Sequence, residues 1–329
     1  MSTVPLYPLR FTPILRRLIW GGRRLGTVLH KPIGDVSDYA ESWEISDYRD
    51  AVSIVENGPL QGSTIRELIA WYGPGLLGSA LAGHQQFPLL VKFIDAHQDL
   101  SVQVHPDDEK GRRLAGDSGK TETWVILQSD PGSAIYAGLK QGVDRDKFAA
   151  AIRSGGVEPL LNRIEPKAGD CILIEAGTVH AIGAGILLAE IQQTSDATFR
   201  VYDWGRTGPD GKPRPLHIDQ ALESIDFNRG PVQPIKPRIE PLESSGTCEH
   251  LSRSAYFALE RLNLERPTPA GRLDRFTILM GLAGSFNVRH GAEINRVDFG
   301  QTLLLPAAVG PCEIIPVDRA QVLSCVLPD

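Results

Sequence analysis

Short runs of apolar residues, or of alternating apolar and polar residues, recur along the whole chain and predict β-strands. Most of them are bounded by glycine, proline or another turn-forming residue. The earlier runs are Ala51–Val55, Leu89–Ala96, Ser101–Val104, Thr123–Leu127, Cys171–Ile174, Ile186–Ile191 and Phe199–Trp204. The later runs are Phe276–Gly281, Ser285–Arg289, Thr302–Leu305 and Val322–Val326. This pattern predicts a mainly β fold with many turns.

Helical signals are few. One helix is expected to begin after an N-cap at Ser63 and to end near Tyr72, before a Gly-Pro pair. A second is expected after Asp144 and through Arg153, where a Gly-Gly pair ends it. A short third helix is expected around Gln220–Ser224.

A proline-rich segment, Asn228–Pro241, separates the two groups of strands. It carries four prolines and predicts an extended linker, because proline fixes φ and removes a backbone donor. We therefore divide the chain into a large part at residues 1–235 and a smaller β part at residues 236–329.

The two parts share a weak internal repeat. Gly169–Gly177 aligns with Gly300–Ala308, since each is a glycine turn that leads into an apolar run and then into small residues. In this register His180 falls opposite Pro311, so the second unit is expected to keep the strand and to lack the histidine. The match is short, and chance similarity between two β-hairpins is the alternative.

Composition narrows the class of protein. The chain has 329 residues, of which 42% are hydrophobic and 22% charged, as in soluble globular proteins. Its net charge of -6 argues against binding to nucleic acid or to an anionic membrane, and no run of about eighteen apolar residues would span a bilayer. The cysteines form no CxxC pair, which excludes zinc-finger and thioredoxin-type sites and favours a reducing, cytoplasmic setting. They are Cys171, Cys248, Cys312 and Cys325.

Two histidines and one glutamate stand where their side chains could converge. Gln103 and His105 are two residues apart in a strand-like run, so both project from one face. If His105, Glu122 and His180 meet, they would hold a divalent metal, with the Gln103 amide oxygen and water as further ligands. Zinc is typical of this donor set when one position stays open to water. Two histidines and a carboxylate also form the facial triad of non-haem iron sites.

Several charged residues could act beside such a centre. Lys120 shares strand parity with Glu122 if that strand begins as early as Gly119. A nearby cation and partial burial would favour a neutral amine that acts as a base; a solvated turn lysine is the alternative. Arg200 stands between two apolar residues, and a charge inside a barrel needs a partner or a ligand. Glu190 either lines the pocket or lies on the outer face. Asp196 either orients Arg200 or simply forms a turn.

A set of segments carries a family resemblance. Gly169–Gly183, with its Gly-x5-Glu-x-Gly-x2-His pattern, resembles the second signature motif of the cupin barrels. Together with Gln103–Pro106, Gly119–Glu122 and Ser195–Trp204, it resembles the type I phosphomannose isomerases, in particular their short bacterial form. The likeness covers most of residues 8–228. It implies that the larger part is a catalytic cupin (jelly-roll) β-barrel. The internal repeat, which lacks the histidine, indicates that the smaller part is a metal-free, cupin-like β unit.

The resemblance also implies an activity and its residues. The expected reaction interconverts mannose 6-phosphate and fructose 6-phosphate, small-molecule sugar phosphates, through an enediol and without a redox cofactor. One Zn²⁺ per chain is implied, and the family's zinc-ligand positions match Gln103, His105, Glu122 and His180. Lys120 and Arg200 match residues assigned to catalysis, with Arg200 pairing with phosphate or stabilising the enediolate. Some members carry a histidine before the lysine, where this chain has Gly119, so a role of that histidine in ring opening does not carry over.

Three classes of function remain open at this point. The zinc-dependent isomerase is preferred to a non-haem iron cupin oxygenase because Gln103, Lys120 and Arg200 suit an anionic substrate that is not oxidised. An inactive sugar-binding cupin is the third, and the presence of every expected ligand argues against it. A phosphate-loop reading of Gly119–Thr121 fails because Leu114 stands where that motif needs glycine.

Overall fold

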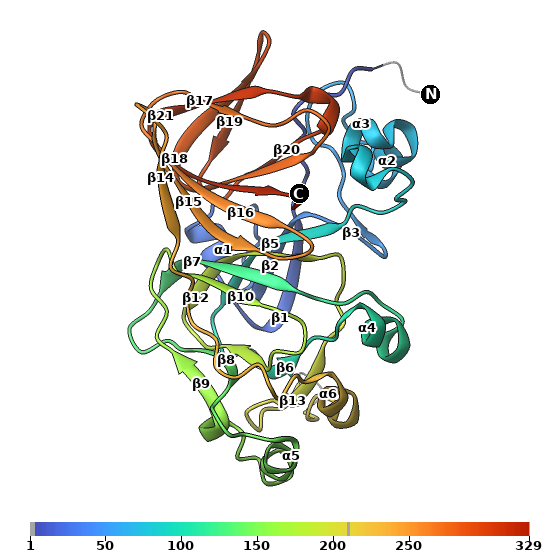
Figure 1. Ribbon diagram of the computed structural model, residues 1–329, viewed down its shortest axis with the longest axis vertical. Coiled ribbons are helices and arrows are strands. Elements are labelled where there is room, and N and C mark those ends of the chain that lie inside the picture. The colour runs from blue at the N-terminus through green and yellow to red at the C-terminus, as the bar shows by residue number, and fades with distance from the viewer. Residues whose placement is uncertain (1–3, 209–210, 329) are drawn as a thin grey trace.

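The computed structural model describes residues 4–208 and 211–328, which form two β-rich lobes (Figure 1). The strands of the first lobe, with the short β3–β4 hairpin, are β1 (Ile14–Gly22), β2 (Tyr39–Ile45), β3 (Asp47–Tyr48), β4 (Ala51–Val52), β5 (Leu89–Ala96), β6 (Val102–Val104), β7 (Glu122–Ser129), β8 (Ile135–Leu139), β9 (Leu161–Ile164), β10 (Cys171–Ile174), β11 (His180–Ile182), β12 (Ile186–Gln193) and β13 (Phe199–Tyr202). The strands of the second lobe are β14 (Arg238–Pro241), β15 (Gly246–Arg253), β16 (Ala258–Leu264), β17 (Thr268–Ala270), β18 (Thr277–His290), β19 (Glu293–Asp298), β20 (Thr302–Leu305) and β21 (Cys312–Val326).

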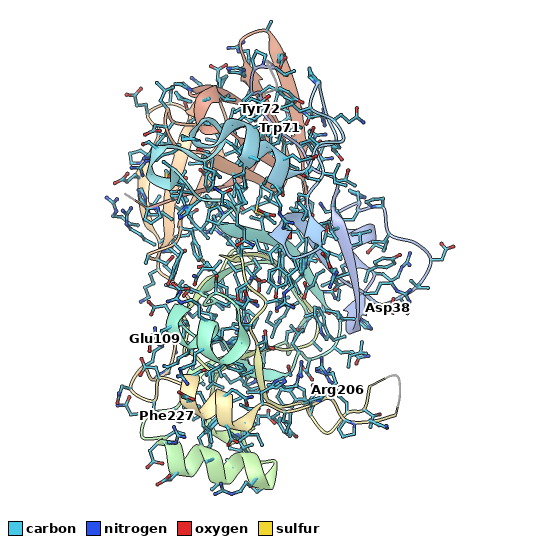
Figure 2. All side chains as sticks on the ribbon, turned by 90° about the vertical axis from the view of Figure 1, so that its right-hand side faces the viewer. Asp38, Trp71, Tyr72, Glu109, Arg206 and Phe227 are labelled. Carbon is cyan, nitrogen blue, oxygen red and sulfur yellow. The ribbon has the colours of Figure 1, made fainter. Side chains whose placement is uncertain are left out.

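The α-helices are short. They are α1 (Arg24–Thr27), α2 (Ile65–Tyr72), α3 (Pro74–Leu77), α4 (Asp108–Ala115), α5 (Arg145–Ser154) and α6 (Ile218–Ser224). Figure 2 shows α2, labelled at Trp71 and Tyr72, beside the second lobe, whereas Glu109 of α4 lies on the first lobe. Within the described ranges no helix combines the length and the apolar character needed to cross a membrane.

Two antiparallel sheets face each other in the first lobe. One has the order β1-β2-β5-β12-β7-β10 and the other β13-β6-β11-β8-β9. Their inner faces share one hydrophobic core, to which Ile94 and Trp124 contribute from the first sheet and Ile135 and Ile182 from the second. This sandwich confirms the predicted mainly β fold, and the space between its sheets holds the site described below.

The second lobe is one eight-stranded sheet with the path β14-β15-β16-β21-β18-β19, to which β17 and β20 add through β21 and β18. Its core includes Phe286, Leu303 and Val322. A larger core joins the two lobes, because residues of β5 and β12 pack in one cluster with residues of α2 and the C-terminal strands. The domain boundary between residues 235 and 236 stays a prediction, since this core extends across it.

Most predicted elements are present, and the differences have local causes. The cap of α2 is Thr64 rather than Ser63, because Thr64 accepts from the Glu67 backbone while the Glu67 carboxylate accepts from Thr64 in return. The predicted linker ends in a strand, since an edge strand such as β14 tolerates the proline at its last position. The repeat has a structural counterpart, because β10 and β20 occupy aligned positions and each follows a glycine with positive φ.

Candidate metal centre

Gln103, His105, Glu122 and His180 lie together between the two sheets of the first lobe. Glu122 begins β7 of the six-stranded sheet, whereas His180 of β11 pairs directly with Gln103 of β6 in the five-stranded sheet. His105 follows β6 at the point where Pro106 ends the strand. The four side chains therefore come from facing sheets and converge from opposite sides.

The donor atoms of this cluster are close and buried. His105 Nε2 lies 3.4 Å from Glu122 Oε2, and His180 Nε2 lies 3.5 Å from Glu122 Oε1. All three side chains are about 1% exposed. His105 Nε2 and Glu122 Oε2 have no hydrogen-bond partner, which is costly for buried polar atoms unless a ligand completes them. These orphaned atoms fit a metal bound between them.

The backbone orients both imidazole rings. His105 Nδ1 lies 2.8 Å from the carbonyl of Ala197, and His180 Nδ1 lies 2.9 Å from the carbonyl of Thr178. A ring nitrogen that donates to a carbonyl leaves the other nitrogen with its lone pair free, as metal-ligating histidines require. Both Nε2 lone pairs therefore face Glu122.

The Gln103 amide points at His180, with its terminal group 3.3 Å from His180 Nε2. Its other terminal atom lies 3.3 Å from Ser101 Oγ. Because the oxygen and nitrogen of an amide are assigned by their partners, a half-turn would place the oxygen toward the centre and the nitrogen toward the hydroxyl. The amide is thus placed to serve as a fourth protein ligand.

The protonation states also suit a metal. Burial and the Lys120 ammonium lower the pKa of His105. Burial and the neighbouring His105 ring lower the pKa of His180 to about 3. For Glu122, burial favours the neutral acid, but Lys120 and His105 outweigh it and lower the pKa. Two neutral imidazoles and one carboxylate are the forms that bind a divalent cation.

A pocket of about 310 Å³ opens beside Glu122 and is lined by Lys120 and Arg200. Lys120 is 5% exposed, with Nζ 3.3 Å from Glu122 Oε2. Arg200 of β13 is half-buried, and it donates from Nε to Ser101 Oγ at 3.1 Å and from Nη1 to the Pro215 carbonyl at 2.9 Å. Both partners are uncharged, and no carboxylate of the described residues forms an ion pair with Arg200. Its positive charge is therefore available to bind an anionic ligand.

Gly119 sits where a side chain has no room. A Cβ built there would lie 2.5 Å from the backbone nitrogen of Asp108, at the start of α4. The Gly119 amide donates to Asp108 Oδ1 at 2.9 Å, and the Lys120 amide donates to the Pro106 carbonyl at 3.0 Å. The close packing of α4 therefore accounts for glycine at this position.

Sequence reasoning missed a buried charge network in the wall of the same pocket. Lys92 Nζ lies 3.2 Å from Glu190 Oε1 and 3.5 Å from Glu41 Oε2. Trp124 Nε1 donates to Glu190 Oε2 at 2.9 Å, so Glu190 faces the pocket rather than the outer surface. A lysine between Val91 and Phe93 of β5 was the signal that could have revealed this network.

Two other residues line the pocket. Asp196, for which two roles were open, borders it, and its backbone nitrogen donates to Asp117 Oδ2 at 3.2 Å. Arg214 also borders it and is held by Asp203, with Nε 2.7 Å from Oδ2. Arg214 lies in a loop without periodicity, so nothing in the sequence pointed to it.

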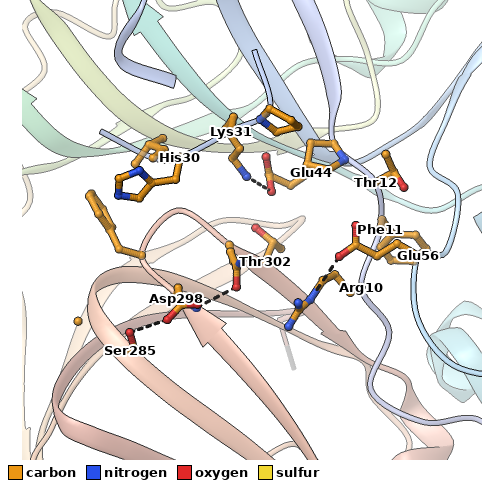
Figure 3. A pocket seen from close by; sticks show the side chains of 16 residues that line it. Arg10, Phe11, Thr12, His30, Lys31, Glu44, Glu56, Ser285, Asp298 and Thr302 are labelled. Atoms are coloured by element: carbon orange, nitrogen blue, oxygen red, sulfur yellow. Dashed lines mark hydrogen bonds and ion pairs between the residues drawn. The ribbon is translucent and has the colours of Figure 1, made fainter. Parts of the chain in front are cut away.

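A larger cavity of about 550 Å³ lies between the amino-terminal segment and the second lobe (Figure 3). Its charged groups are already paired, with Lys31 Nζ 2.7 Å from Glu44 Oε2 and Arg10 Nε 3.6 Å from Glu56 Oε1. None of the predicted site residues lines it. The smaller pocket is the better candidate because it holds the orphaned donors and the available arginine.

Family, sequence and structure comparisons all find phosphomannose (mannose-6-phosphate) isomerases. Residues 9–125 match the family described as phosphomannose isomerase type I, catalytic domain. The chain is 34% identical to mannose-6-phosphate isomerase ManA of Bacillus subtilis (strain 168), over 94% of this chain and 95% of that protein. The crystal structure of the mannose 6-phosphate isomerase from Bacillus subtilis matches with a TM-score of 0.88, at 29% identity over 98% of this chain and 99% of the other. A mannose 6-phosphate isomerase bound with zinc and yttrium has the same fold, with a TM-score of 0.75 and 17% identity over 97% of this chain and 99% of the other.

Proposed function

The chain belongs to the type I phosphomannose isomerase family, and we propose from this that it interconverts mannose 6-phosphate and fructose 6-phosphate at the centre described above. The observation that carries the proposal is the convergence of two buried imidazole nitrogens and one carboxylate, with orphaned donor atoms, beside Lys120 and Arg200. The relatives are named as isomerases, so the iron oxygenase and sugar-binding alternatives are not favoured.

Gln103, His105, Glu122 and His180 would hold a divalent metal, and zinc is the proposed ion. A nitrogen-and-oxygen donor set with a free position supports zinc, and a relative with the same fold is described as bound with zinc. Such an ion supplies Lewis-acid stabilisation of negative charge on the sugar oxygens. The chain's own residues must then place the sugar and move its proton.

Lys120 is proposed as the group that moves the proton. In an aldose-to-ketose conversion a base removes the proton from C2 of mannose 6-phosphate, and its conjugate acid returns a proton to C1 of the enediol. Lys120 is buried at the pocket wall and its Nζ lies 3.3 Å from Glu122, so a base at this position would act on a sugar held in the pocket beside the residues that would hold the metal.

Arg200 is proposed to bind the phosphate. Its hydrogen-bond partners, Ser101 and Pro215, are uncharged, whereas Arg214 is ion-paired with Asp203, a carboxylate that it shares with Arg206. A guanidinium without a carboxylate partner offers a strong site for a phosphate dianion. This arrangement favours phosphate binding over stabilisation of the enediolate.

The buried network of Lys92, Glu41 and Glu190 is proposed to position the sugar. These side chains are held by one another and by Trp124, so their orientation is fixed before the substrate binds. We also propose a reducing, cytoplasmic setting, which the four buried and unpaired cysteines support.

A coupled isomerase assay on metal-analysed protein tests this function. Chelator should abolish turnover and zinc should restore it. His105→Ala should lose both metal and activity, Lys120→Met should keep the metal while kcat collapses, and His84→Ala, an exposed histidine outside the centre, should keep both. Full activity in His105→Ala would refute the metal centre. Unchanged turnover in Lys120→Met would remove Lys120 from proton transfer.

A further inference from the structure

A second group of metal-type side chains lies on the C-terminal sheet. Cys248 and His250 are two residues apart in β15 and project from the same face. Glu240 of β14 pairs with Cys248, and Glu260 of β16 pairs with His250, so both carboxylates share that face. Three neighbouring strands thus bring a thiol, an imidazole and two carboxylates together.

The spacing of these groups approaches that of a coordination shell. The candidate ligand atoms of Cys248, His250 and Glu260 all lie within 4.8 Å of one another. His250 Nδ1 lies 3.2 Å from Glu260 Oε1. In a tetrahedral zinc site the ligand atoms lie about 3.3–3.8 Å apart, as the metal–ligand bond lengths require. Small side-chain rotations would therefore complete the shell.

The outer nitrogen of the imidazole already has the partner that a ligand histidine needs. His250 Nε2 lies 2.9 Å from Glu240 Oε2, on the side away from Glu260. Metal-ligating histidines commonly donate their second ring N–H to a carboxylate, which fixes the tautomer and orients the ring. Glu240 would play this part while Nδ1 faces the ion.

A cavity beside the cluster supplies an independent observation. It has a volume of about 190 Å³ and is lined by Cys248, Glu260 and Thr277. Thr277 is 3% exposed, and its Oγ1 has no hydrogen-bond partner. A buried hydroxyl without a partner is unfavourable, so the cavity beside the cluster contains an unsatisfied polar group.

A simple ion-pair arrangement explains less. A protonated His250 between Glu240 and Glu260 would account for two of the contacts. It does not explain why Cys248 is buried on the same face, or why the buried Thr277 hydroxyl has no hydrogen-bond partner.

We propose that Cys248, His250 and Glu260 bind a second divalent cation of the zinc class, with Glu240 holding the His250 ring. The site is separate from the isomerase centre and uses none of its residues. It joins β15 to β16, and through Glu240 to β14, so its role is to fasten the edge of the C-terminal sheet. This proposal differs from the expectation that the smaller part is metal-free, which rested on Pro311 at the position equivalent to His180. The proposed ligands come from β15 and β16, away from Pro311.

Cobalt is the probe that separates the two sites, because only the second contains sulfur. Full-length protein stripped of metal and titrated with Co²⁺ should bind two equivalents and develop a thiolate-to-cobalt charge-transfer band. Cys248→Ser should lose the band and one equivalent while keeping isomerase activity. Cys312→Ser, a buried cysteine outside the cluster, is the matched control and should keep both.

Loss of the isomerase centre should leave the second site intact. His180→Ala should lose activity and one equivalent of cobalt but retain the charge-transfer band, so failure of the proposed function and failure of the second site give different results. The second site is overturned if wild-type protein shows no band, or if the band persists in Cys248→Ser. His250→Gln provides a second variant, and a band of undiminished intensity in it would also overturn the proposal.

Discussion

Replacing Lys92 with methionine tests the buried network beside the isomerase centre. Lys92 is 2% exposed, and its ammonium is the cation between Glu190 and Glu41. Burial acts against this charge, but the two carboxylates outweigh burial and raise the pKa of Lys92. Methionine keeps the length and most of the packing while removing the charge.

The expected loss of stability is large because the variant leaves carboxylates without their counter-ion. Glu190 is 3% exposed and would be the most affected. Removing one partner of a buried ion pair typically costs about 3–5 kcal/mol. Lys92→Met should therefore lower the free energy of unfolding by about this amount at pH 8, and Lys147→Met, at an exposed lysine of α5, should change it by less than about 0.5 kcal/mol.

The loss should depend on pH with a definite sign. Burial already raises the pKa of Glu190 above its ordinary value near 4.5, and Lys92 opposes that rise. Without Lys92 the folded-state pKa rises further, so the folded variant binds a proton more tightly than the unfolded chain. Its stability relative to wild type should recover as the pH falls through this raised pKa.

Urea unfolding followed by circular dichroism at pH 8 and pH 5.5 measures these changes. The double variant Lys92→Met/Glu190→Gln should be more stable at pH 8 than Lys92→Met alone, because glutamine carries no charge to leave unpaired. A loss below about 1 kcal/mol for Lys92→Met, or no recovery in the double variant, would refute the assignment of Lys92 as the buried counter-ion.

Three further changes probe other parts of the chain. Gly119→Ala places a Cβ against Asp108, so it should lower the free energy of unfolding in urea by about 1–3 kcal/mol. It should also reduce turnover by displacing the neighbouring Lys120. Unchanged stability would mean that α4 shifts to make room for the Cβ. Arg200→Gln should raise KM for mannose 6-phosphate more than it lowers kcat, and an effect on kcat alone would assign it to the enediolate instead. Thr64→Ala breaks the capping box with Glu67 and should cost about 1 kcal/mol without altering activity, whereas Thr64→Gly should cost less than Thr64→Ala.

The sequence predicted strands most accurately where a largely apolar run is bordered by turn-forming residues. Leu89–Ala96 and Cys171–Ile174 are strands with the predicted bounds, because each is a buried run bordered by turn residues. The type I phosphomannose isomerase resemblance is confirmed by the relatives. The helix α4 was missed because it is strongly polar and buries only Gly111, so it has no apolar stripe to detect. An aspartate cap at Asp107 was the available signal.

By itself, the sequence determined which side chains share a face. A strand repeats every two residues, so Gln103 and His105 could be grouped without knowledge of the fold. The grouping of Lys120 with Glu122 required a strand from Gly119, whereas β7 begins at Glu122, so the fold and not strand parity brings Lys120 Nζ to 3.3 Å from Glu122 Oε2. Only the tertiary structure decided that these groups meet, because Glu122 and His180 approach from facing sheets and side-chain parity carries no information about sheet packing. It also decided the chemistry of the imidazoles, since a carbonyl 92 residues away, that of Ala197, turns the free nitrogen of His105 toward the centre.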